Sequence, residues 1–260
     1  MAIVCCSFSP PVQAQFFSGT VSGTITAPEG RANQYIAMGF GAAPQGARVA
    51  FPAGPGLRNA LVRVRIQEIG WTREYFVRTG TNGTYSVPWN HALPPISIMV
   101  SVFAERPNTT AIVTSNPSHL HRITSAGQAD IVLGSSPTFG GQTGAVLINV
   151  ALGGSEFVDA HRTADEVYRT MSAEGVTAVI DLSGLNIFAN TNPLPGLNAF
   201  GGVAPSPNDV LIGPGTATAR PFTLAHEIGH TIAWRGFEVL LPVIGCRSPA
   251  EHAARSSSIG

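Results

Sequence analysis

The first half of the chain, from Phe16 to about Val150, consists of short apolar runs separated by Gly, Pro, Asn and Ser. Residues 61–66 alternate apolar side chains with Arg, which is typical of a half-exposed strand. Residues 71–77 are rich in aromatic and β-branched types, and Asn82-Gly83 predicts a tight turn into the next strand. Further strands are expected at residues 85–87, 96–103 and 129–133. The pattern therefore predicts an all-β first half.

The spacing of apolar positions changes after a Gly- and Ser-rich stretch at residues 134–144. Ser155 is a good helix cap, and apolar side chains then recur at three- and four-residue steps up to Met171. We predict a helix from Glu156 that Gly175 ends, with His161 as a core or boundary residue. Strands are expected at residues 176–182, 185–188 and 209–212, with an irregular loop at residues 190–207.

The N-terminal residues 1–14 favour secretion. An apolar patch at residues 2–6 leads to Val12-Gln13-Ala14, which resembles the small-residue end of a secretory signal. The segment is short and lacks a positive charge, and a start codon assigned late inside a longer signal would explain both features. A frayed N-terminus is the alternative. Cleavage after Ala14 would remove Cys5 and Cys6 and leave Cys246 as the one remaining cysteine. We expect a secreted protein, either extracellular or periplasmic.

The formal charge is balanced, with 15 Lys and Arg residues against 15 Asp and Glu residues. No basic tract is present, so nucleic-acid binding is not expected. No run of the sequence approaches the 18 or so apolar residues that a membrane span requires. The sequence leaves the oligomeric state open.

One short motif suggests chemistry: residues 226–230 read His-Glu-Ile-Gly-His, an H-E-x-x-H pattern. On a helix, positions i and i+4 share a face, so His226 and His230 can both bind one Zn²⁺. Glu227 beside them can take a proton from a water that the zinc activates. The alternative is a pair of core histidines that bind no metal. Apolar neighbours indicate a buried helix that opens near Pro221, so we expect buried imidazoles.

A hydrolytic zinc site takes three protein ligands, and the motif supplies two. The longer pattern H-E-x-x-H-x-x-G-x-x-H would need Gly and His where the chain has Ala233 and Gly236. Glu251 is the best remaining candidate, because the segment from Ser248 could open a helix that turns this carboxylate toward the metal. The other possibility is a ligand beyond residue 260.

The literal His-Glu-Ile-Gly-His resembles the bacterial HEIGH metallopeptidases, and the order of helix, mixed sheet and motif helix resembles the N-terminal subdomain of zincins. The resemblance implies a secreted bacterial zinc metallopeptidase of gluzincin type, truncated before its third ligand. It also implies an edge strand above the metal that pairs with an extended peptide or protein substrate. Leu211-Ile212 is the candidate for that strand or its neighbour.

Residues 18–104 resemble the transthyretin-like or carboxypeptidase-regulatory sandwich, through a V-x-V strand at residues 62–64 and T-x-x-N-G-x-Y at residues 79–85. The expected fold class is α+β, an N-terminal all-β sandwich followed by a partial zincin-like domain. The expected segments are a residual signal peptide (1–14), the sandwich (16–133), a linker or domain entry (134–150) and the incomplete zincin-like domain (151–260). His91, His119 and His121 are expected to be surface histidines without a metal.

The predicted function is hydrolysis of peptide bonds, with Zn²⁺ as cofactor, His226, His230 and Glu251 as ligands and Glu227 as general base. The alternative is a catalytically inactive extracellular binding module with a relic zinc site. Hydrolysis of another kind of bond is a third possibility, because H-E-x-x-H specifies metal chemistry and not the substrate.

Overall fold

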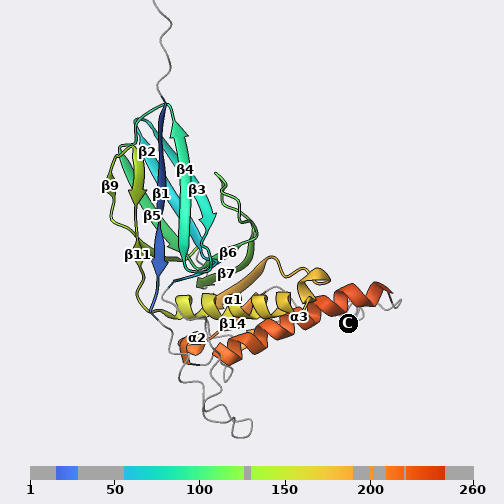
Figure 1. The fold of residues 1–260 in the computed structure, drawn as a ribbon. Helices are drawn as coiled ribbons and strands as arrows, with labels where there is room; N and C mark the ends of the chain where they lie inside the picture. Colours follow the sequence, from blue (N-terminus) through green and yellow to red (C-terminus); the bar gives the residue numbers. More distant parts are fainter. Residues whose placement is uncertain are drawn as a thin grey trace, which may run out of the picture.

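The computed structural model describes residues 16–28, 56–125, 130–189, 199–201, 209–219 and 221–243. The strands in these ranges form three sheets, and the helices pack against the third sheet (Figure 1). The chain thus combines a strand-rich architecture with a few helices, which agrees with the predicted fold class in its coarse outline.

Two sheets form a β-sandwich in the first half of the chain. In one sheet, β1 (Phe17–Thr26) pairs in parallel with β10 (Gly144–Leu147) and β11 (Val150–Ala151), and antiparallel with β4 (Thr84–His91). The other sheet has the order β3 (Trp71–Arg78), β2 (Leu61–Glu68), β5 (Ser97–Phe103) and β8 (Val132–Ser135), with β9 (Phe139–Gly140) on β5. Asn82-Gly83 forms the predicted turn, in which Gly83 has a φ of 76°.

The sandwich core follows from the period of two along its strands. On β4, exposed and buried residues alternate strictly, so that Tyr85, Val87 and Trp89 point inward. They meet the inward residues of the opposite sheet, among them Val62, Val64, Ile66, Ile98, Val100 and Val102. The sandwich therefore has an apolar core of its own.

The third sheet is mixed, with the strand order β13 (Ala199–Gly201), β14 (Asp209–Ile212), β12 (Leu185–Ala189), β7 (His119–Ser125) and β6 (Glu105–Pro107). The three central strands are parallel, and the two outer strands are antiparallel to their neighbours. The helices α1 (Glu156–Ala173), α2 (Thr216–Ala219) and α3 (Pro221–Val243) join this sheet in a second apolar core. Ile123, Ile187 and Val210 of the sheet belong to it, together with Leu224 and Ile228 of α3.

Helix α1 begins and ends where its sequence predicts. Ser155 has extended backbone geometry, and its Oγ accepts a hydrogen bond from the Val158 N–H at 3.3 Å. Gly175 follows the helix in the left-handed conformation, with a φ of 76°, which glycine adopts without steric cost. His161 is fully buried, as expected of a residue on the apolar face of this helix.

The strand predicted at residues 176–182 is wrong, because the chain forms a short 3₁₀ helix, η2 (Val176–Ala178), in this segment. Val176 and Ile180 both pack against the second core, whereas Val179 is exposed. A four-residue step between apolar contacts suits a helical turn and not a pleated strand. The β-branched residues that suggested a strand are used here to cover the core beside α1.

The long-range pairing of strands departs from the expected segment boundaries in two places. Residues 105–107 and 119–125, expected within the sandwich, form β6 and β7 of the third sheet, with β7 parallel to β12. Residues 139–140 and 144–147, expected within a linker, form β9 and β10 of the sandwich. Leu133 packs against both cores. The two halves of the chain are therefore interleaved through residues 105–151.

Candidate metal centre

Helix α3 carries the motif and begins at Pro221, close to its predicted start. Leu224, Ile228, Thr231 and Ile232 form the buried stripe of the helix. His226 and His230 lie on the opposite side and are exposed, while Glu227 is half-buried. The expectation of buried imidazoles is therefore wrong. Leu224, Ile228 and Ile232 each lie two residues from a motif histidine, which is more than half a helical turn. Thr231 follows His230 directly and is also buried.

The two motif histidines converge at their outer ring nitrogens. The Nε2 atoms of His226 and His230 are 3.0 Å apart, a spacing at which one ring donates a hydrogen bond to the other. Their ring centroids are 4.5 Å apart and the ring planes are nearly perpendicular, at 85°. Two imidazole ligands of one tetrahedral Zn²⁺, each at 2.0–2.1 Å, would have their nitrogens about 3.3 Å apart. The two ring nitrogens therefore lie within a few tenths of an ångström of this spacing.

The third ligand is not found in the part of the chain that the structure describes. Within those ranges, no group of three His, Cys, Asp or Glu side chains is placed so that it could hold a metal ion. Ala233 and Gly236, at the positions where the longer motif has Gly and His, offer no donor side chain. Glu251 and Cys246 lie outside the described residues. The assignment of Glu251 as a ligand remains a prediction.

The outer strand β13 lies next to the motif helix. It is antiparallel to β14, and α3 contacts both strands. In the described residues, β13 pairs on one side only and forms one edge of the third sheet. Leu211 and Ile212 belong to β14, so they lie in the neighbour of the edge strand. An unpaired edge of this kind can accept the backbone of an extended peptide.

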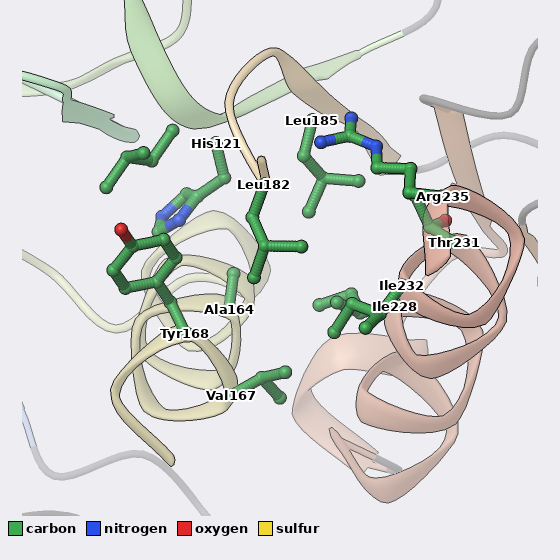
Figure 2. Close-up of a pocket in the computed structure, with 11 residues that line it drawn as sticks. His121, Ala164, Val167, Tyr168, Leu182, Leu185, Ile228, Thr231, Ile232 and Arg235 are labelled. Carbon is green, nitrogen blue, oxygen red and sulfur yellow. The ribbon is translucent and has the colours of Figure 1, made fainter. Parts of the chain in front are cut away.

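A small apolar pocket lies on the buried side of α3, between this helix and α1 (Figure 2). Ile228, Thr231, Ile232 and Arg235 contribute to it from α3. The cavity volume is about 20 Å³, so the pocket is little larger than the space that one water molecule needs. None of the three predicted site residues on α3 lines the pocket. The pocket is therefore separate from the candidate metal centre, which lies on the open face of the helix.

Two further histidines form a buried pair that the sequence reasoning missed. His121 Nε2 on β7 lies 3.0 Å from His161 Nδ1 on α1, and His161 Nε2 lies 3.1 Å from the carbonyl oxygen of Arg58. Since only His161 Nε2–H can donate to that carbonyl, His161 Nδ1 accepts from His121 Nε2–H. Burial lowers the pKa of both imidazoles and so favours their neutral forms, which this pattern of donor and acceptor requires.

The expectation of surface histidines is thus wrong for His121 and also for His91, which is buried beside Glu68. His119 is half-buried, and burial lowers its pKa. The position of His121 two residues before Ile123 was an available signal, because both side chains then fall on the same face of a strand. Pro117 and Ser118 instead suggested a loop.

No protein-family model matches the chain, and no curated protein or solved structure is significantly similar to it. None of the helices in the described ranges combines the length and apolar character needed to cross a bilayer.

Proposed function

We propose that this chain is a secreted zinc-dependent metallopeptidase with His226 and His230 as metal ligands and Glu227 as general base. The observation that carries the proposal is the convergence of the two Nε2 atoms, 3.0 Å apart on the exposed side of α3. Imidazole nitrogen is a preferred ligand of Zn²⁺, and the exposure of both rings leaves room for further ligands and for a substrate. The donor set therefore fits zinc as far as it is described.

Zn²⁺ bound between these rings would supply Lewis-acid chemistry, polarising a substrate carbonyl and making a water molecule more acidic. His226 and His230 hold the ion from adjacent turns of α3. Glu227 follows His226 directly, and its carboxylate accepts the proton of the attacking water and returns it to the leaving amine. The edge strand β13 would orient an extended peptide beside the site through backbone hydrogen bonds.

The arrangement of the third sheet supports a peptide substrate over other substrates. A zincin N-terminal subdomain combines a mixed sheet, a backing helix and the motif helix with an edge strand beside the metal. The mixed sheet here has α1 and α3 packed against it and the antiparallel β13 beside α3. The partial zincin-like domain and the membership of this peptidase class are part of the proposal.

A second candidate function is an inactive extracellular binding module in which the zinc site is a relic. The described residues favour it in one respect, since they supply two ligands where a hydrolase needs three. Measurements of zinc binding and of peptide-bond cleavage by the chain distinguish the two functions.

The test uses the full chain loaded with zinc and freed of excess metal, followed by measurement of bound zinc and of casein cleavage. The proposal predicts one zinc per chain, loss of zinc in His230→Ala, and retention of zinc with a roughly 10²–10⁴-fold loss of cleavage in Glu227→Gln. His119→Gln is the matched control, because it removes a half-buried imidazole from β7 and should change neither quantity.

Three outcomes would contradict the enzyme. No zinc at micromolar concentrations would remove the metal site altogether. Bound zinc without any cleavage would favour the binding module, and cleavage unaffected by Glu227→Gln would remove the general base. Glu251→Gln should weaken zinc binding if its carboxylate is the third ligand and leave zinc binding unchanged if another group fills that position.

A further inference from the structure

Large apolar side chains gather at the end of the sandwich that lies farthest from the helices. Phe16, Ile69, Trp71 and Ile96 are exposed by 64%, 67%, 68% and 49% of their surface. We call these four residues the apolar tip. They come from the start of β1, the turn between β2 and β3, and the connection between β4 and β5. Single exposed apolar residues are common, but a cluster at one end usually marks an interaction surface.

Strand pairing places these three connections at the same end. Phe17 at the start of β1 pairs with His91 at the end of β4, and Glu68 pairs with Trp71 across the β2–β3 turn. The Ile96 N–H donates to the carbonyl oxygen of Gln67 at 2.6 Å, which ties the third connection to the second. The opposite end of β1 lies at α1, where Arg162 donates to the carbonyl of Ala27. Figure 1 shows β1 beginning away from α1 and α3.

A buried polar cluster fixes the strand ends beneath the apolar tip. The hydroxyl of Tyr75 is hydrogen-bonded to Nε2 of His91 at 2.6 Å, and Nδ1 of His91 is paired with the carboxylate of Glu68. Glu68 and His91 are both buried, and the rings of Tyr75 and His91 are stacked within 11° of parallel. These contacts join β2, β3 and β4. The strand ends that carry the apolar tip are therefore held together by these buried contacts.

The exposed charge around the apolar tip is positive. Within the residues that form this end, namely 67–73, 91–97 and 139–143, the single acidic residue is Glu68, which is buried. Arg73 lies two residues from Trp71, and its Nε is 3.5 Å from the buried carboxylate of Glu68, while about half of its side chain is exposed. Such a surface combines apolar side chains with a cation and exposes no carboxylate. Phospholipid head groups fit this combination, and Trp is a preferred residue at the membrane interface.

The small exposed area of the apolar tip argues against a second copy of the chain as its binding partner. The four side chains together expose on the order of 500 Å² of surface. A stable protein interface buries about 800 Å² on each partner. Projecting loop ends bury less than this area against a flat protein surface. The same loop ends can insert between lipid head groups.

We propose that the apolar tip docks the protein on the surface of a phospholipid bilayer by shallow insertion of Phe16, Ile69, Trp71 and Ile96. Strand β1 has ten residues and so spans roughly 33 Å, which holds α3 at about that height above the lipid. The proposal does not depend on zinc or on catalysis.

The test measures co-sedimentation of the full chain with vesicles of phosphatidylcholine alone and with added phosphatidylglycerol at a 3:1 ratio. The double variant Ile69→Ser, Trp71→Ser should lower the partition coefficient by about tenfold or more. Leu147→Ser and Val179→Ser are matched controls, because both residues are 69% exposed and lie outside the apolar tip. They should bind vesicles as the wild type does. Stronger binding to the anionic vesicles would support a contribution from Arg73.

Tryptophan fluorescence gives an independent readout. Trp71 is exposed, Trp89 is buried in the sandwich and Trp234 on α3 is half-buried outside the apolar tip. Vesicles should therefore shift the Trp71 contribution, and with it the emission of the wild type, to the blue. Trp71→Phe should keep most of the binding and lose the shift. Absence of wild-type binding to both vesicles would overturn the proposal, as would equal losses in the Leu147→Ser control. A concentration-dependent dimer that the double variant abolishes would also overturn it, in favour of a second copy.

Discussion

Replacing Asp165 tests how the two halves of the chain are held together. Asp165 lies on α1 with 1% of its side chain exposed. Its carboxylate accepts hydrogen bonds from Arg58 Nε at 2.5 Å, from Asn59 Nδ2 at 2.9 Å and from an Nη of Arg106. Arg58 and Asn59 precede strand β2 of the sandwich, and Arg106 belongs to β6 of the third sheet. One carboxylate thus joins three segments.

The cost of removing this charge follows from the burial of its partners. Arg58 and Arg106 expose only 11% and 9% of their side chains. Burial lowers the pKa of Arg106, and the Asp165 carboxylate opposes that shift. Asp165→Asn removes the carboxylate that pairs with Arg106 and leaves Arg58 with the partly exposed Glu166 as its remaining partner. Breaking a buried pair in this way costs about 3–5 kcal/mol. For a chain of this size the melting temperature should fall by roughly 6–20 °C.

Urea unfolding followed by circular dichroism measures the change in free energy, and a thermal melt gives the shift in temperature. Glu166→Gln is the matched control on the next position of α1. Glu166 is 25% exposed and also pairs with Arg58, so its loss should cost less than about 1 kcal/mol. An Asp165→Asn protein within 1 kcal/mol of the wild type would refute the reasoning, and so would an equal loss in the control.

Three further predictions, at Gly23, Ser155 and Glu105, have defined outcomes in the same unfolding assay. Gly23→Ala would place a Cβ 1.9 Å from the carbonyl oxygen of Ile148 and should cost about 1–3 kcal/mol, whereas Gly153→Ala meets nothing within 4 Å and should stay within about 0.5 kcal/mol. Ser155→Ala removes the cap of α1 and should cost about 1 kcal/mol, which Ser155→Asp should restore. Burial raises the pKa of Glu105 from 4.5 to about 7, so wild-type stability should fall as pH rises between these values, by up to about 3 kcal/mol. Glu105→Gln should remove that fall, and an equal effect of the substitution at pH 4 and pH 8 would contradict it.

Local signals in the sequence predicted several elements correctly. Helix α1 was predictable because a capping serine, a helical apolar period and a terminal glycine all occur within 21 residues, Ser155 to Gly175. The strands β12 and β14 were predictable from short apolar runs between turn residues. The start of α3 followed from Pro221 and the motif spacing. In each case the information lies within one or two helical turns or one strand.

Features that depend on distant residues could not be predicted in this way. Arg58 contacts Asp165 and His161 across 107 and 103 residues of sequence. No residue near His121 indicates that β7 pairs with β12, or that this pairing places His121 against α1. Helix α3 has apolar residues on both sides of its histidines, so its pattern did not determine which side packs inward. In the folded chain the side of α3 with Leu224, Ile228 and Ile232 packs inward, which leaves His226 and His230 exposed.

X-ray absorption at the zinc edge, on the full chain loaded with one equivalent of Zn²⁺, tests the central claim most directly. The account predicts at least two imidazole ligands at about 2.0–2.1 Å, with loss of bound zinc in His230→Ala and unchanged ligation in His119→Gln. A sulfur ligand at about 2.3 Å without imidazole would place zinc on a cysteine and away from α3. Either that spectrum or a zinc site indifferent to His230→Ala would contradict the proposed metal centre.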